Sequence, residues 1–238
     1  MDRVLDILRK QNISIDHPEA VVDKLERYMN GILRLNEKIN LTAIIGRDEF
    51  IQKHFLDSLM CAGDIANSEF SRIIDIGTGA GFPGVPLAIV FPEKDFVLVD
   101  SLAKRIRIIE ELCALLAVHN ISAVHGRAEE LAGNGAYREA FDLCVSRAVA
   151  NMSTLSEYCL PFVKVGGAFI AYKGPDCAEE VAAASTAIEL LGGDCTQILK
   201  PNIEGVPFDH TFVKIKKRKN TPKAYPRKAG TPGRKPLQ

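Results

Sequence analysis

The feature that most constrains this chain is an apolar run that leads straight into a glycine-rich turn. Ile73, Ile74 and Ile76 predict a short strand that is covered on both faces, as in a parallel sheet. Residues 77–84 then include four glycines, which remove the side chains that would keep a ligand away from the backbone. A helix is expected to follow, because Pro86 falls in a first turn whose N–H groups lack intrahelical partners. Strand, turn and helix together predict a cradle for a nucleotide-type cofactor.

The glycine turn matches the patterns of two cofactor classes. Gly79, Gly81 and Gly84 satisfy G-x-G-x-x-G, the pattern of dinucleotide-binding turns. Gly77 begins a second pattern, G-x-G-x-G preceded by the acid Asp75, which class I S-adenosylmethionine (SAM) methyltransferases show. A buried acid repels a pyrophosphate, whereas SAM carries no phosphate. Asp75 therefore favours SAM, either by contacting the ligand or by hydrogen-bonding the N–H groups of the turn.

A second acid, Asp100, stands at the end of the next predicted strand, residues 96–100. A carboxylate at this point accepts hydrogen bonds from ribose hydroxyls, which both cofactor classes carry. Asp100 also suits the N-cap of the following helix, and the two roles are compatible. That helix is expected from Leu102 to about Leu116, because its apolar residues form one stripe.

Strands and helices alternate along the rest of the chain. Such alternation is typical of an α/β protein with a doubly wound, mostly parallel sheet, here of seven strands. Ligands of these sheets lie at the carboxyl ends of the strands. The turn at residues 126–130 is expected there to read an adenine through a backbone N–H and an acid side chain. The further strands are predicted at residues 121–125, 141–145, 168–172, 195–199 and 211–215, and the helices at 151–160 and 178–191.

Residues 1–70 are predicted to be helical rather than α/β. Apolar positions 21, 25, 28, 29, 32 and 33 form one stripe of a helix. Asp16 and Glu19 form a capping box at its start, with Pro18 in the first turn. We expect a small helical cap that packs on the sheet and shapes a substrate cleft. The expected organisation is thus a helical cap at 1–70, a ligand-binding α/β domain at 71–215 and a C-terminal tail at 216–238.

Motifs along nearly the whole chain resemble one family. They are DIGTGAGFPGVPLAI from residue 75, VDSLAKR from 99, GRAEEL from 126, VSRAVA from 145 and YKG from 172, with HFLDSL at 54–59 and PRKAGTPGRKPL at 226–237. The chain is similar to the RsmG family, also called GidB. These bacterial methyltransferases place a methyl group from SAM on ring nitrogen 7 of one guanine in small-subunit (16S) ribosomal RNA. The resemblance implies a Rossmann-like class I SAM methyltransferase fold with an N-terminal helical extension.

The resemblance also implies the residues of the cofactor site. The family's SAM contacts fall in the glycine turn, in the turn after the third strand and after the fourth strand, and Asp100 joins them by its position. The expected SAM-binding residues are Gly77, Gly79, Gly81, Phe82, Asp100, Ala128, Glu129 and Arg147.

The expected chemistry needs no general base. No D-P-P-Y-like or N-P-P-Y-like segment, the clamp used on exocyclic amines, follows the fourth strand. Guanine N7 has a free lone pair and loses no proton on methylation, so the reaction depends on positioning and charge placement. We therefore assign no catalytic residue. Arg147, Lys173 and Arg127 are the candidates for positioning the substrate, through an RNA phosphate or the guanine carbonyl edge.

The net charge of zero conceals a strong asymmetry. Residues 214–238 hold ten of the 30 Lys and Arg residues and none of the 30 Asp and Glu, so the remainder carries a net charge of −10. With few large apolar groups and four prolines, residues 216–238 cannot fold alone and are expected to be flexible. A polyanion is the expected partner of residues 214–238, here the 16S RNA or the small ribosomal subunit.

Composition limits the setting of this function. No apolar run reaches the roughly 20 residues needed to cross a bilayer, and residues 1–11 are amphipathic and carry acids, unlike a signal peptide. Six cysteines without a C-x-x-C pair indicate reduced core residues of a cytoplasmic protein. The five histidines are scattered, so we expect no metal site and SAM as the only cofactor. A monomer is the default expectation.

Two other functions fit parts of this pattern. An NAD-dependent oxidoreductase is supported by the G-x-G-x-x-G glycines and Asp100 alone. A ribosome-assembly factor that binds SAM without catalysis fits the glycine turn and the basic tail.

Overall fold

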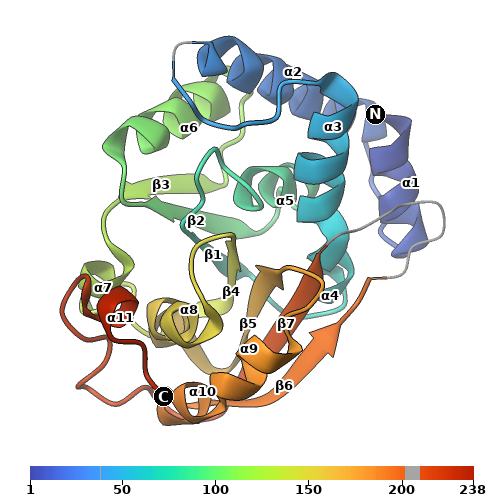
Figure 1. Cartoon of the computed structure of the whole chain (residues 1–238). Coiled ribbons are helices and arrows are strands. Elements are labelled where there is room, and N and C mark those ends of the chain that lie inside the picture. The colour runs from blue at the N-terminus through green and yellow to red at the C-terminus, as the bar shows by residue number, and fades with distance from the viewer. Residues whose placement is uncertain (38, 202–209) are drawn as a thin grey trace.

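The centre of the protein is a seven-stranded sheet with the order β3-β2-β1-β4-β5-β7-β6 (Figure 1). It is seen in a computed structural model that describes residues 1–37, 39–201 and 210–238, apart from the side chains of Cys195 and Thr196. The strands from β3 to β5 pair in parallel, while β7 is antiparallel to both β5 and β6. The predicted doubly wound, mostly parallel sheet is confirmed. The strands are β1 (Arg72–Ile76), β2 (Asp95–Asp100), β3 (Ile121–His125), β4 (Phe141–Arg147), β5 (Val163–Lys173), β6 (Gly193–Leu199) and β7 (Thr211–Lys217).

The strand order reverses between β1 and β4. From β1 the chain moves outward to β2 and β3, and then returns to β4 on the other side of β1. In open α/β sheets, ligands bind outside the carboxyl ends of the strands at such a switch point. The fold therefore places the glycine turn after β1 and the end of β4 at the expected binding edge.

Helices cover both faces of the sheet, and successive strand residues serve different faces. Ile73 packs with the core on one face and Ile74 with the core on the other, which is the alternation that a strand requires. On the Ile73 face lie α5 (Gly84–Val90) and α6 (Ala103–Leu115) together with the N-terminal helices. On the Ile74 face lie α7 (Ala128–Leu131), α8 (Met152–Cys159), η3 (Leu160–Phe162), α9 (Ala178–Ala183) and α10 (Ser185–Leu190). The helix predicted at 178–191 is thus divided into two.

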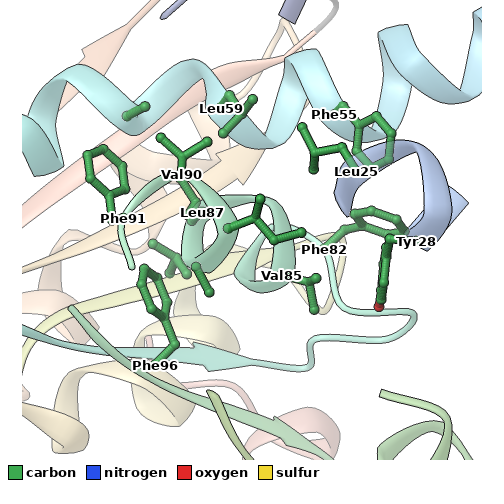
Figure 2. Packing of buried hydrophobic residues seen from close by; sticks show 14 of the residues in the cluster. Leu25, Tyr28, Phe55, Leu59, Phe82, Val85, Leu87, Val90, Phe91 and Phe96 are labelled. Carbon is green, nitrogen blue, oxygen red and sulfur yellow. The ribbon is translucent and has the colours of Figure 1, made fainter. Parts of the chain in front are cut away.

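The N-terminal helices share one hydrophobic core with the sheet. The predicted stripe of α2 is confirmed, because Leu25, Tyr28 and Met29 are fully buried. Figure 2 shows Leu25 and Tyr28 beside Phe82, Val85 and Leu87. The expected capping box is wrong: His17 occupies the N-cap of α2, and it makes no side-chain capping bond. The N-terminal elements are α1 (Asp2–Lys10), α2 (Pro18–Asn36), α3 (Arg47–Phe50), the π-helix η1 (Ile51–Leu56), the 3₁₀ turn η2 (Leu59–Cys61) and α4 (Ala62–Ala66).

The end of the chain corrects the expectation of a flexible tail at 216–238. β7 continues to Lys217, whose Nζ is buried and donates to Leu160 O (2.6 Å) and Thr221 Oγ1 (2.5 Å). The chain then runs along α7 and α8 and ends in a short helix, α11 (Thr231–Arg234). Counting apolar groups missed this docking, because polar anchors fix the segment more than a hydrophobic core does. Arg138 illustrates this, since its guanidinium donates to the carbonyls of Thr221 and Tyr225.

Two further expectations concern composition. Among the described residues, no helix has the length and apolar character that spanning a membrane requires. Within the same residues, no group of three or more His, Cys, Asp or Glu is placed to hold a metal ion. Cys195 has a side chain outside the described part, and the other cysteines are free and buried: Cys61, Cys113, Cys144, Cys159 and Cys177.

Candidate cofactor and substrate site

A cavity of about 300 Å³ lies at the carboxyl ends of β1 and β2. Its walls come from the glycine turn, the end of β2, the turn after β3 and the loop after β4. Of the predicted SAM-binding residues, Gly77, Asp100, Ala128 and Glu129 line it, and so does the substrate candidate Arg127. This is the switch-point location that the topology predicts.

Most N–H groups of the glycine turn are already used inside the protein. Those of Gly77 and Thr78 both donate to Val99 O, at 2.9 and 3.0 Å. Those of Gly81 and Phe82 donate to Thr78 O, both at 2.9 Å. A pyrophosphate needs such N–H groups free and pointing at it. The turn therefore does not suit a dinucleotide, and it fits a cofactor that carries no phosphate.

Asp75, at the end of β1, stabilises the conformation of the glycine turn through hydrogen bonds. It is fully buried, and its Oδ2 accepts hydrogen bonds from Thr78 Oγ1 (2.7 Å) and Gly84 N–H (2.9 Å). A Cβ on Gly84 would lie 2.8 Å from this oxygen, so only glycine fits there. Burial raises the pKa of Asp75 to about 6, although these hydrogen bonds oppose the shift. The sequence predicts Asp75 either to contact the ligand or to hydrogen-bond the N–H groups of the turn, and the structure shows the second role.

Asp100 joins the turn to the second strand. Its Oδ2 accepts from Gly79 N–H (2.9 Å) and its Oδ1 accepts from Leu102 N–H (2.8 Å). Arg105 lies 3.3 Å from the same carboxylate. The N-cap of α6 is Leu102, which is exposed rather than part of the predicted apolar stripe. Because a carboxylate has about four acceptor positions, Asp100 retains capacity toward the cavity that it lines.

The loop after β4 approaches the glycine turn closely. Gly77 has φ +74°, and a Cβ there would lie 2.4 Å from Val149 Cγ2. Ala148, with φ +56°, and Val149 both line the cavity. The absence of a side chain at Gly77 is therefore what lets the β1 and β4 sides of the cavity meet.

Glu129 of α7 and Tyr158 of α8 also line the cavity. Glu129 is mostly buried, and its Oε1 accepts a hydrogen bond from Gly230 N–H (2.8 Å) in the C-terminal segment. Sequence reasoning missed Tyr158 and this contact. Helical periodicity places Tyr158 on α8, but only the docked C-terminus shows that this part of α8 faces the cavity.

Gly79, Gly81, Phe82 and Arg147, the other four predicted SAM-binding residues, lie outside the lining of the cavity. Phe82 is buried, and its ring stacks on that of His54 at 4.3 Å between centroids with an interplanar angle of 3°. Tyr28 meets the same ring edge-on, and its hydroxyl donates to Ala80 O (2.8 Å). Phe82 therefore links the glycine turn to the N-terminal helices.

Arg147 lies at the centre of a buried polar cluster. Its Nη1 donates to Asp57 Oδ2 (2.6 Å) and to Lys53 O (2.9 Å), and its guanidinium carbon lies 5.5 Å from the centroid of Phe82. The side chains of Arg147 and Asp57 are 11% and 4% exposed, so this pair is largely shielded from water. His210 also donates to Asp57, at 2.7 Å. The sequence signal for this cluster was the HFLDSL segment, whose side-chain contacts could not be foreseen.

His54 is held neutral within the same cluster. Arg147 Nη2 lies 3.1 Å from His54 Nδ1, so this nitrogen is an acceptor and Nε2 carries the proton that is donated to Thr42 Oγ1 (2.8 Å). Burial and the neighbouring Arg147 charge lower the pKa of His54 to about 3. The residue lies in the π-helix η1, a backbone form that is frequent at functional sites.

Lys173 and Arg127, the other substrate candidates, lie in different surroundings. Lys173 Nζ donates to Glu180 (2.6 Å) and to Ala150 O (3.0 Å), so it fixes the loop after β4. Arg127 precedes α7 at the mouth of the cavity and is exposed. The structure therefore brings Arg127 to the cavity and pairs Lys173 internally.

Solved structures with similar folds include methyltransferases. A SAM-dependent O-methyltransferase from Thermotoga maritima has a TM-score of 0.55 at 15% identity, covering 79% of this chain and 72% of that chain. M. jannaschii TYW2 in complex with AdoMet has a TM-score of 0.54 at 13% identity, covering 74% and 79%. At such identity these likenesses concern the fold alone.

Sequence comparisons define the relationship more narrowly. The model of the GidB family, rRNA small subunit methyltransferase G, matches residues 21–203. Ribosomal RNA small subunit methyltransferase G of Clostridium novyi (strain NT) is 47% identical over 227 residues, 95% of this chain and 93% of the relative. The protein of that name from Alkaliphilus oremlandii (strain OhILAs) is 45% identical over 235 residues, 98% of each chain.

The strand order, the glycine turn and the acid at the end of β2 define a Rossmann-like α/β fold of the methyltransferase type. Within this fold class, the chain belongs to the GidB family of rRNA small subunit methyltransferase G proteins.

Proposed function

We propose that this protein transfers a methyl group from SAM to ring nitrogen 7 of a guanine in 16S ribosomal RNA. The observation that carries the proposal is the cavity beside a glycine turn most of whose N–H groups are used internally, in a chain nearly half identical to ribosomal RNA methyltransferases. The choice of guanine N7 rests on the family resemblance. The NAD-dependent oxidoreductase and the non-catalytic assembly factor gain no support from the relatives.

The residues around the cavity suit the parts of SAM. Asp100 offers a carboxylate to the ribose hydroxyls, and Ala128 and Glu129 offer a backbone and an acid to the adenine. The amino-acid end would be held on the side of the cavity lined by Gly77 and Val149. The contacts of Gly79 and Arg147 with SAM are part of the same proposal. For Gly81 and Phe82 we propose an indirect role, because they fix the turn.

When bound, SAM would supply a methyl group on its sulfonium: the N7 lone pair of guanine would bond to the methyl carbon while the C–S bond breaks and S-adenosylhomocysteine leaves. The protein then has to orient the base and keep water out, and no proton needs to be removed. The cluster at the end of β4 agrees with this requirement: His54 is neutral, and Asp57 balances the charge of Arg147. We propose that this cluster borders the place of the guanine.

The proposal includes the partner and its setting. Residues 214–238 are the basic segment that would contact RNA phosphates, and Arg127 adds a cation at the cavity mouth. A cytoplasmic location follows from a ribosomal RNA substrate. A monomer stays the expectation, and size-exclusion chromatography with light scattering tests it.

Methyl transfer from labelled SAM to small ribosomal subunits and to naked 16S RNA tests the function. We expect label on one guanine, mapped by cleavage at N7-methylated bases, and the same base unmodified in cells that lack the protein. Tight SAM binding without transfer to either substrate would favour the assembly factor, and tight NAD binding without SAM binding would favour the oxidoreductase.

Asp100→Asn tests the cofactor site itself. Loss of a charged hydrogen bond costs about 1.5–3 kcal/mol, so SAM affinity measured by calorimetry should fall by about 10- to 150-fold. Asp95→Asn is the matched control, because Asp95 is exposed at the opposite end of the same strand. Equal affinities of the two variants would remove Asp100 from the site.

A further inference from the structure

The C-terminal segment, residues 218–238, is anchored by a buried ion pair. Glu157 of α8 is fully buried, and its carboxylate accepts Arg227 Nη2 at 2.6 Å, Arg227 Nε at 2.9 and 3.1 Å, and Arg227 N–H at 2.7 Å. Such a fork fixes both the position and the direction of the chain. Two further contacts continue the docking: Gly230 N–H donates to Glu129, and Thr154 Oγ1 donates to Pro232 O.

This docking leaves other cations of the segment facing water. Lys228 and Lys235 are exposed, and neither side chain has an ion pair among the described residues. Arg234 is also exposed, with one bond from its Nε to Gly230 O. All three lie within five residues of Gly230, whose N–H is bonded to the cavity residue Glu129.

The exposed cations are therefore held beside the cofactor cavity. In Figure 1, α11 lies next to α7, and α7 begins directly after Arg127 at the cavity mouth. Within residues 222–238 no acid interrupts the positive charge. A flexible chain could not keep these charges in one place, whereas the Arg227–Glu157 pair does.

We propose that Arg127, Lys228, Arg234 and Lys235 form a preordered surface that binds the phosphate backbone of the RNA substrate next to the cofactor cavity, and that the Glu157–Arg227 pair is its positioning device. This inference rests on the proposed function for the identity of the substrate. It differs from binding by a flexible basic tail. For a preordered surface, RNA affinity depends on docking of the C-terminal segment, whereas for a flexible tail it depends on the number of charges alone. Ordering a flexible segment during association costs affinity, and docking of the backbone removes that cost in advance.

Two variants separate docking from charge. Glu157→Gln removes an acid and keeps every cation, and Arg227→Lys keeps the charge but loses the planar fork. We expect each variant to bind a 16S RNA transcript about tenfold more weakly at 150 mM salt, because the cations lose their preordering. A flexible tail predicts the opposite for Glu157→Gln, namely equal or tighter binding, since the net charge rises by one. That result in both variants would overturn the proposal.

Charge-removing variants complete the test. Lys228→Gln with Lys235→Gln should make the negative slope of log affinity against log salt shallower, by about 0.7–0.9 for each phosphate that is no longer neutralised. Arg3→Gln with Arg9→Gln is the matched control, because both residues are exposed on α1, across the molecule from α11 in Figure 1. An equal change of slope in both double variants would also overturn the proposed RNA-binding surface.

Hydrogen exchange supplies the readout of docking. The amides of Arg227, Gly230 and Thr231 should exchange faster in Glu157→Gln and Arg227→Lys than in the parent, with the core strands unchanged. Unchanged exchange together with weaker RNA binding would contradict the positioning role. RNA affinity is measured without SAM, so it is independent of methyl transfer. Loss of transfer in the parent protein would defeat the proposed function, and the RNA measurements would still decide on the surface.

Discussion

On one side of the β1–β4 switch point lies a cavity of about 300 Å³, bounded by glycines and carboxylates. On the other side, Arg147, Asp57, His54 and Phe82 fill the space with their own contacts. The first region is kept open by the absence of side chains, and the second is closed by charges that satisfy one another. Substitutions in the first region should therefore change ligand affinity through added volume, whereas those in the second should change stability through unpaired charge.

The largest expected effect is that of Asp57→Asn in the closed region. It leaves Arg147 without its carboxylate in a site where the guanidinium is only 11% exposed. Removing one partner of a buried pair costs about 3–5 kcal/mol of unfolding free energy, measured by urea denaturation. Asp23→Asn, which breaks the exposed pair with Arg27, is the control and should cost less than about 1 kcal/mol. Similar losses in the two variants would show that the cluster is not a closed, desolvated region.

The next effect is expected in the open region, from Gly77→Ala. The new Cβ would meet Val149 at 2.4 Å and force a side chain into a left-handed backbone, φ +74°. Backbone strain of about 1–2 kcal/mol and overpacking of about 1–3 kcal/mol should lower the unfolding free energy by their sum. Gly79→Ala shares the positive φ but has open space, so it should show the strain alone. The losses of SAM affinity, measured by calorimetry, should follow the same order, and a reversed order would contradict the role of Gly77 in joining the β1 and β4 sides of the cavity.

A smaller effect concerns acid stability. The pKa of His54 is about 3 in the folded protein, below its ordinary 6.5, so the unfolded chain binds a proton that the folded protein does not. Stability therefore falls as the pH drops from 6.5 toward 3, by up to about 2 kcal/mol at pH 5. Asp75 acts in the opposite sense: its raised pKa, about 6, returns stability as the pH falls from 6 toward 4.

His54→Gln should unmask the contribution of Asp75. Urea denaturation at pH 7.5 and pH 5.0 should show a loss on acidification that is smaller in this variant than in the parent. The exposed His119→Gln should keep the profile of the parent. If both variants lose the same unfolding free energy between pH 7.5 and pH 5.0, His54 is not shielded by the cluster.

The smallest effect is expected for Lys173→Met, at the outer edge of the closed region. Lys173 is already paired with Glu180 and Ala150 O, so it has little capacity for an RNA phosphate. RNA affinity by filter binding should change by less than about twofold, within the range of surface charges that make no direct contact. A loss as large as that of Lys228→Gln with Lys235→Gln would return Lys173 to the candidates for RNA binding.

The open region could be predicted from the sequence and the closed one could not. The glycine spacing, Asp100 and the strand pattern are local signals, and they led to the sheet, the glycine turn and the turn at 126–130. The family resemblance then named Ala128 and Glu129, which line the cavity. Arg147 was found by resemblance, but its partner Asp57 lies 90 residues earlier, and no local rule joins the two. The docked C-terminus was missed for the same reason, since Glu157 and Arg227 are 70 residues apart.

Tyr28 has a consequence for the modularity of the protein. Its hydroxyl donates to Ala80 O, and it occupies the space that a Cβ on Gly81 would need, 2.3 Å away. An N-terminal helix thus completes the glycine turn from outside the sheet. A shortened chain that starts at residue 71 would keep every cavity-lining residue and still lose part of the support for the turn. The helical part and the sheet are therefore not interchangeable units, and a chimera that exchanges one for a distant relative's version has to match this tyrosine–glycine contact.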